Sequence, residues 1–289
     1  MPLTRVNSTS LTHPSLFGGF ILCALLPVMA LCQSANERAE ILSRRAGSEF
    51  MDGKMTAAVK HFEEAGNLAP LSDADAFTLA MALVNLGDEP HARALLKNLS
   101  DKHPTQAIYI YWLGRLDYSQ RRYQEAIEKL TRASDLDPGS ARVWDSLGLA
   151  FDMQGLVDDA LRALQKAEKL NRTLAHPSAW PPHDLGFLLL RMDRQQEAEA
   201  SLREALRYDP NFAQAHYHLA RALEKQARNT EAIAEYRTAI SLDGASPDAC
   251  YSLAMLYRKL HRDSEAAATI AEYKRRKQGA LEELAKSHG

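Results

Sequence analysis

Apolar and small residues return along this chain with a period of 34 residues, from Ala39 to Ala280. Within each period, two stretches have helical apolar spacing and a short polar turn separates them. Counted from the start of each period, position 20 is always alanine: Ala58, Ala92, Ala126, Ala160, Ala198, Ala232 and Ala266. The pattern predicts a helix–turn–helix unit that is repeated along the chain.

The register defines seven repeats, with four additional residues (175–178) between the fourth and the fifth. The repeats are 39–72, 73–106, 107–140, 141–174, 179–212, 213–246 and 247–280. Residues 281–289 are expected to form a C-terminal capping helix and tail, because an end repeat has one face without a neighbour. The exposed end of the first repeat is indicated by Arg45, which stands where later repeats have leucine.

Two further positions indicate how the helices pack. Position 8 is glycine or alanine in every repeat, and position 24 is a large apolar or aromatic residue such as Phe62, Leu164 or Tyr236. Small side chains let two helices approach closely, and large neighbours fill the remaining space. We therefore expect position 8 to lie where two helices touch.

The fourth repeat carries the fullest motif. Trp144, Leu147, Gly148 and Phe151 have the spacing W-x2-L-G-x2-Y, and the A-x3-F-x2-A pattern follows in residues 160–167. On these residues the chain resembles the tetratricopeptide repeat (TPR) family. The resemblance implies an all-α, right-handed α-solenoid of seven helix pairs.

Helix ends are also marked. Pro70, Pro104, Pro138 and Pro210 stand at position 32, where proline disfavours helical geometry in the preceding residue. Acidic residues at position 19 of repeats three to seven favour the start of the second helix in those repeats. The segment 175–182 contains three prolines, so we expect a bend there between repeats four and five. Trp180 in this segment is either an exposed anchor or folds back onto Leu189.

The N-terminus has the features of a targeting segment. Residues 16–31 are apolar, yet shorter than the roughly 20 residues of a membrane-spanning helix. We predict a cleaved signal peptide at 1–32, a linker at 33–38 and a periplasmic or secreted protein. An uncleaved anchor, or a lipoprotein lipidated at Cys32, are the alternatives, and only these would place the protein at a membrane.

Composition excludes several functions. The net charge of −2 gives no general attraction to nucleic acid, and three cysteines, two of them in the apolar leader, make no disulfide framework. Nucleophile-elbow, dinucleotide, P-loop and metalloprotease motifs are absent from the sequence. His216 and His218 point to different helix faces and are poorly placed to share a metal. We predict no enzyme activity, cofactor, metal site or nucleic-acid partner.

In the TPR family, positions 2, 5, 9, 12 and 13 of the first helices usually line a concave binding surface. Carried over, these positions imply an aromatic and basic face suited to an acidic peptide. The family's carboxylate clamp is not supported, because position 6 has no asparagine. The candidate partner-binding residues, with Trp180 added from the proline-containing segment 175–182, are Phe77, Tyr111, Arg115, Tyr118, Trp180, Tyr217, Arg221, Tyr251 and Arg258.

The sequence thus predicts an exported, non-enzymatic scaffold that binds a protein or peptide on its concave surface. A membrane-tethered assembly subunit of a cell-envelope complex is the alternative.

Overall fold

The computed structural model describes residues 19–242 and 247–287, with side chains described within 34–242 and 247–278. All regular structure in these ranges is α-helical, in fourteen helices without a strand. The fold is the all-α TPR solenoid class that the repeats predict. The chain divides into two compact units, 1–101 and 102–289, each described here by itself.

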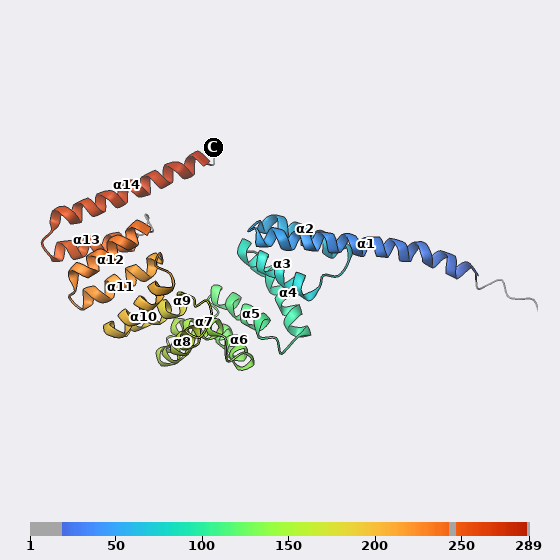
Figure 1. The fold of residues 1–289 in the computed structure, drawn as a ribbon, viewed down its shortest axis with the longest axis horizontal. Helices are drawn as coiled ribbons and strands as arrows, with labels where there is room; N and C mark the ends of the chain where they lie inside the picture. The colour runs from blue at the N-terminus through green and yellow to red at the C-terminus, as the bar shows by residue number, and fades with distance from the viewer. Residues whose placement is uncertain (1–18, 243–246, 288–289) are drawn as a thin grey trace, which may run out of the picture. The chain divides into compact units, whose positions relative to one another are not determined.

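Unit 1 contains the first two helix pairs, and α1 lies beside α2 (Figure 1). Its core includes Ala46, Ala58 and Phe62, all fully buried, whereas Arg45 is exposed at the end repeat as expected. The helices are α1 (Gly19–Met51), α2 (Met55–Leu68), α3 (Asp73–Leu86) and α4 (Glu89–Lys102).

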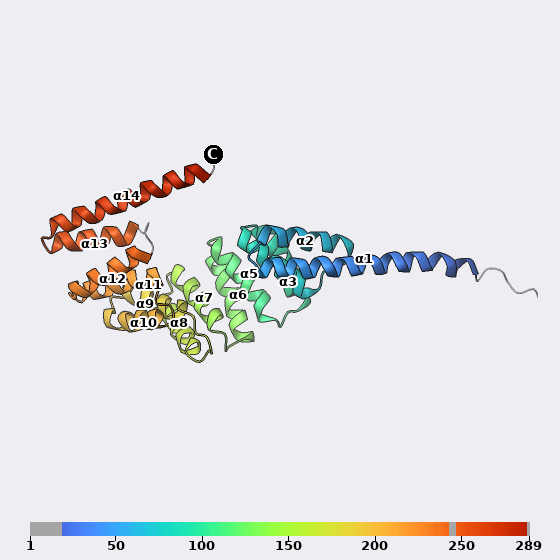
Figure 2. The same ribbon diagram turned by 45° about the horizontal axis from the view of Figure 1, so that its top comes forward.

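Unit 2 contains five helix pairs, in which each first helix packs against its own second helix, and each second helix packs against the first helix of the following pair (Figure 2). The helices are α5 (Ala107–Ser119), α6 (Tyr123–Leu136), α7 (Ala141–Met153), α8 (Val157–Asn171), α9 (Trp180–Arg191), α10 (Gln195–Tyr208), α11 (Ala213–Lys225), α12 (Asn229–Leu242), α13 (Pro247–Lys259) and α14 (Asp263–Ser287). The second helices stop two residues before Pro70, Pro104, Pro138 and Pro210, as predicted.

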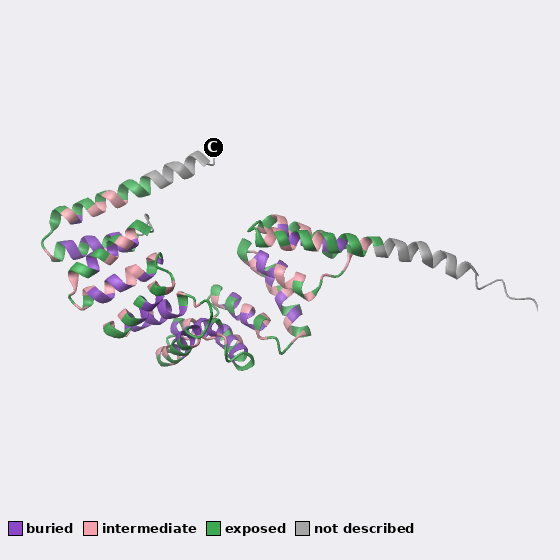
Figure 3. Ribbon diagram, in the orientation of Figure 1, coloured by how far each residue is buried: buried purple, intermediate pink, exposed green. Residues whose placement is uncertain are grey.

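The small residues of the repeat lie where helices meet. All seven alanines at position 20 are at most 1% exposed, and buried residues line the facing sides of the helix pairs (Figure 3). A Cβ on Gly114, Gly148 or Gly186 would come within 2.9 Å of the leucine at position 24 of the same repeat. Position 8 is therefore the point of closest approach within a helix pair, which confirms the packing prediction.

The turn between the two helices of each pair has a second periodic feature, which the sequence analysis did not identify. Position 15 adopts a left-handed conformation in all seven repeats. The residues are Gly53, Gly87, Arg121, Gly155, Asp193, Ala227 and His261, with φ between 58° and 79°. This conformation ends a helix and is natural for glycine, but costs other residues roughly 1–2 kcal/mol.

The insertion 175–178 does not divide the solenoid. The Asn171 side chain donates to Ser178 O at 2.8 Å and accepts from Ser178 N at 2.9 Å, which closes the loop. Arg172 bridges α8 to α10 through Glu204 at 2.7 and 2.6 Å. One core cluster continues from Leu164 through Leu185 to Leu256. The expected bend is not a unit boundary; the division falls instead between Asp101 and Lys102.

The N-terminal predictions fall largely outside the described residues. Residues 1–18 are not described, and of 19–33 only the helical backbone is. The predicted linker 33–38 is helical and lies inside α1, because its Ala, Glu and Arg residues are strong helix formers. Across the part of the chain that the structure describes, no helix combines the length and apolarity needed to cross a membrane.

Candidate functional site

The first helices of unit 2 contact one another in sequence order: α5 with α7, α7 with α9, and α9 with α11. Their common surface is here called the first-helix face. Position 5 of one repeat meets position 6 of the next at two places on it. Tyr111 lies 3.5 Å from Ser146, oxygen to oxygen, and His183 lies 3.0 Å from His218, nitrogen to nitrogen.

The contact between position 5 of one repeat and position 6 of the next removes Tyr111 from the predicted binding residues. Tyr111 is only 1% exposed, and its hydroxyl accepts a 3.1 Å hydrogen bond from Arg115. Its ring packs edge-on against Trp112. Because α7 covers it, Tyr111 belongs to the core and is closed to a partner. At the same repeat position Tyr251 is 66% exposed, since α13 is the last first helix and no further one covers it.

The other predicted residues are spread over different surroundings. Phe77 is half-buried on α3 of unit 1, and Arg115 and Arg258 are exposed on α5 and α13. Tyr118 is half-buried against Tyr123, and burial raises its pKa. The structure brings Trp180 and Tyr217 together around one cavity, and Arg221 and Tyr251 around another.

The first cavity, here the aromatic cavity, has a volume of 510 Å³ and opens on α9, α11 and α13. Its wall includes Trp180, His183, Phe187, Tyr217 and His218. Trp180 is 52% exposed and stands edge-on against Phe212, with ring centres 4.7 Å apart. Neither reading of Trp180 from sequence describes this position fully, because the ring is supported on one side and open on the other.

A chain of hydrogen bonds fixes the two histidines of the aromatic cavity. His183 Nδ1 lies 2.7 Å from Asp184 Oδ1, and His183 Nε2 lies 3.0 Å from His218 Nδ1. A proton on His183 Nδ1 is donated to the Asp184 carboxyl oxygen, and the facing nitrogens of His183 and His218 share one proton. Burial, then the charges of His183 and Arg221, lower the pKa of His218 to about 3, so this ring is uncharged at physiological pH.

Behind this wall lies a buried carboxyl group. Asp145 on α7 is 9% exposed, and its Oδ1 receives no hydrogen bond from the described residues. Burial and the negative charge of Asp184 raise its pKa well above the usual value, while Arg115 opposes the rise. Asp145 is therefore held protonated over part of the pH range in which an exposed aspartate is ionised.

The second cavity, here the basic cavity, has a volume of 300 Å³ and lies between α11 and α13. Arg221, Lys225 and Lys259 supply its positive charge, and Tyr251 and Met255 supply exposed apolar surface. Its one carboxylate, Glu224, accepts a 2.9 Å hydrogen bond from Tyr236. Lys225 pairs with Asp193 at 2.6 Å, whereas Arg221 and Lys259 form no ion pair with any described residue.

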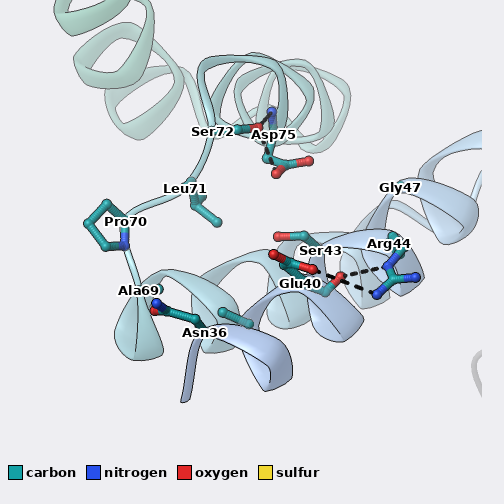
Figure 4. A pocket seen from close by; sticks show the side chains of 11 residues that line it. Asn36, Glu40, Ser43, Arg44, Gly47, Ala69, Pro70, Leu71, Ser72 and Asp75 are labelled. Atoms are coloured by element: carbon teal, nitrogen blue, oxygen red, sulfur yellow. Dashed lines mark hydrogen bonds and ion pairs between the residues drawn. The ribbon is translucent and has the colours of Figure 1, made fainter. Parts of the chain in front are cut away.

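Unit 1 has a larger hollow of 780 Å³ along α1 and the start of α3 (Figure 4). Its charged side chains Glu40 and Arg44 pair with each other at 3.9 Å, and Ser72 caps α3 by bonding to Asp75. The described residues contain no group of three or more His, Cys, Asp or Glu side chains that could hold a metal ion. Of these three cavities, the basic cavity is the one lined by cations that have no ion-pair partner among the described residues.

The sequence analysis missed the grouping of His183, Asp184, Phe187 and His218. One signal was available, because partners on neighbouring first helices are 35 residues apart, one period plus one residue. Tyr111 and Ser146 have the same separation. Phe212, whose ring contacts those of Trp180 and His183, gave no such signal, since it lies in the turn before α11.

Comparison with known proteins agrees with the geometry. Residues 77–141, 113–175 and 183–249 match the tetratricopeptide repeat, which covers more than half of the chain. The chain therefore belongs to the TPR family. This family membership makes it a protein–protein interaction scaffold by fold.

Individual relatives are distant. The general transcriptional corepressor ssn6 of Schizosaccharomyces pombe is 21% identical over 187 residues, which are 64% of this chain and 16% of the corepressor. Pseudomonas aeruginosa pilF superposes with a TM-score of 0.63 at 20% identity, covering 75% of this chain and 97% of pilF. YrrB, described as a TPR protein with an unusual peptide-binding site, has a TM-score of 0.51 at 17% identity, covering 62% and 90%. At these identities the similarity establishes the fold.

Proposed function

We propose that this protein is an exported, non-enzymatic scaffold that binds a peptide segment of a protein partner on the concave, first-helix face of unit 2. The basic cavity carries the proposal. Two of its cations, Arg221 and Lys259, have no ion-pair partner among the described residues, and Tyr251 beside them is 66% exposed. Exposed tyrosine and arginine side chains are the types that dominate binding energy at protein interfaces.

The chemistry of this cavity favours an acidic group on the partner. A guanidinium donates two parallel hydrogen bonds to a carboxylate, and Lys259 adds a second positive charge. The Tyr251 ring and Met255 side chain offer apolar contact to the rest of the segment. YrrB, with its described peptide-binding site, supports the use of this fold for peptide recognition.

We propose binding rather than catalysis because proteins of this family are generally scaffolds and the first-helix face presents recognition chemistry. The polar groups in the aromatic cavity hold one another in hydrogen bonds, from Asp184 through His183 to His218. The exposed groups in the basic cavity are cations and a phenol, which are suited to contact with an anionic partner.

Export is proposed from the apolar segment 16–31. Among residues 34–51 of α1, whose side chains the structure describes, the buried positions are Ala39 and Ala46, which both follow the proposed cleavage after Ala30 or Cys32. One observation favours the membrane-tethered alternative: α1 runs without interruption from Gly19 to Met51, so an uncleaved leader would be continuous with unit 1. Mass spectrometry of the mature protein separates them, because a free N-terminus at Leu31 or Gln33 requires cleavage.

Selection from a library of random displayed peptides tests the binding proposal. We expect the protein to enrich peptides that contain acidic residues. Replacement of Tyr251 and Tyr217 by alanine should weaken their binding without loss of helicity by circular dichroism. Enrichment of no sequence class, or peptides insensitive to both substitutions, would overturn the proposal.

A further inference from the structure

We propose that the aromatic cavity is a second subsite, which binds an arginine or lysine side chain of the same partner segment. This inference rests on the proposed function for the identity of the partner. The chemistry of the cavity supports the subsite independently of the proposed function, because it depends only on the residues that line the cavity.

The cavity wall is a series of aromatic rings in mutual contact. The Phe187 and His218 ring centres are 4.7 Å apart, those of Tyr217 and His218 are 5.1 Å apart, and Trp180 meets His183 at 5.7 Å. The faces of such rings carry negative potential and attract a cation within about 6 Å of the ring centre. Trp180, the strongest of these π-systems, has its open side toward solvent.

The same rings already bind cations within the protein. The Arg191 guanidinium lies 6.0 Å from the Phe187 ring centre, and Arg221 lies 5.8 Å from that of Tyr217. Neither arginine lines the aromatic cavity, because Arg191 pairs with Asp152 and Arg221 faces the basic cavity. The cavity therefore has the ring surfaces that cations favour, while these two cations are engaged elsewhere.

The charge of the aromatic cavity is negative. Its lining contains two carboxylates, Asp184 and Asp248, and neither lysine nor arginine. Asp248 is exposed in the first turn of α13 and forms no ion pair with the described residues. His218 adds no positive charge, since burial keeps this ring neutral. A cation placed among the rings would meet the carboxylates of Asp184 and Asp248, with no lysine or arginine in the wall.

The two subsites are neighbours. Tyr217 lines the aromatic cavity, and Arg221, one helical turn further along α11, stacks on it and lines the basic cavity. A single bound segment can therefore place a basic residue in one cavity and an acidic residue in the other. We infer that the recognised motif contains both charges at a fixed separation.

Calorimetric titration with N-acetylarginine amide and N-acetylcitrulline amide tests the subsite, because the two probes have similar shape and differ in charge. We expect the arginine probe to bind the wild-type protein at least about tenfold more tightly. Asp248→Asn should remove most of that difference. Asp263→Asn is the matched control, since Asp263 is an exposed first-turn aspartate of α14 and should leave the difference intact.

Equal affinity for the two probes would overturn the subsite, as would an arginine preference that Asp248→Asn leaves unchanged. Displayed-peptide selection separates this failure from that of the proposed function. Acidic peptides without a recurring basic residue would leave the basic cavity standing and remove the aromatic subsite. An arginine preference in calorimetry without any selected peptide would keep the subsite and remove the peptide-binding function.

Discussion

Gly148 on α7 and Leu164 on α8 touch so closely that a Cβ added to Gly148 would lie 2.6 Å from Leu164 Cγ. The same glycine–leucine contact holds α5 to α6 and α9 to α10. Each helix pair is thus closed by one small residue against one large one. The predictions below begin with this contact.

Replacement of Gly148 by alanine should destabilise unit 2 by about 1–3 kcal/mol, because the new methyl group overpacks against Leu164. Gly47→Ala is the matched control. Gly47 lies within α1, and an added Cβ there meets nothing within 4 Å, so alanine should stabilise by about 0.5–1 kcal/mol. Chemical denaturation measures the change in the free energy of unfolding for each variant. A Gly148→Ala protein that is more stable than the wild type would contradict the packing account.

The substitution Ala227→Gly should stabilise the protein. Ala227 has φ 59° in the turn between α11 and α12, where an L-residue pays roughly 1–2 kcal/mol and glycine does not. After the entropic cost of glycine, a net gain of roughly 0.5–1 kcal/mol remains. Gly155→Ala, at the same repeat position, should lose about 1 kcal/mol although its Cβ would meet open space. The measurement is the thermal midpoint of both variants. A lower midpoint for Gly155→Ala shows backbone strain, because the added methyl group has no neighbouring atom to clash with.

His216 should stabilise the fold most at low pH. Its Nδ1 lies 2.6 Å from Glu235 and its Nε2 lies 3.0 Å from Pro210 O, so both nitrogens donate when the ring is charged. Burial lowers the pKa of His216, but the Glu235 hydrogen bond and charge outweigh it and raise the pKa above its usual value. The stabilisation is therefore complete below about pH 6.5 and is lost as pH rises through the raised pKa.

His216→Gln should accordingly cost most stability in acid and least in mildly alkaline solution, as followed by urea denaturation across pH. A cost that does not change with pH would show that the charged ring contributes nothing.

His218 should have the opposite dependence. Its pKa is lowered to about 3, mainly by burial, so between about pH 3 and 6.5 the unfolded chain binds a proton that the folded protein does not. Wild-type stability should fall through this window as pH decreases. In His218→Gln this fall should be smaller, and an unchanged pH slope in the variant would place the ring in solvent rather than in the aromatic cavity.

Asp145→Asn should stabilise the protein increasingly as pH rises above about 4, the usual aspartate value. Burial first, and then repulsion from Asp184, raise the pKa of Asp145, so above about pH 4 the unfolded chain gives up a proton that the folded protein keeps, and stability falls until the folded carboxyl also ionises. The amide has no proton to lose. The measurement is the difference in thermal midpoint between variant and wild type at several pH values, and a constant difference would mean that Asp145 ionises freely.

The repeat architecture was predictable because helix pairing is a local property. Alanine at position 20 and the residues at positions 8 and 24 meet within one repeat, so one period contains the information. The division after Asp101 was not predictable, since the helical repeat continues unchanged through it.

The candidate site was predictable only in part. Tyr111 and Tyr251 hold the same repeat position, yet one is buried and the other exposed, because only Tyr111 is covered by a following first helix. The position of a residue within the repeat predicts the direction of its side chain. Whether that side chain is exposed depends on the helix of the neighbouring repeat that covers it. The aromatic cavity needed three dimensions, because Trp180, His218 and Asp248 come from three separate helices, α9, α11 and α13.

The central claim is that the first-helix face of unit 2 binds a peptide, and a charge reversal tests it most directly. Lys259→Glu changes the basic cavity, whereas Lys169→Glu makes the same change on α8, where Lys169 is exposed and lines neither cavity. The measurement is the dissociation constant of a selected acidic peptide for the wild type and both variants. We expect Lys259→Glu to weaken binding at least about tenfold and Lys169→Glu to leave it unchanged. Equal affinity in all three proteins would contradict the account.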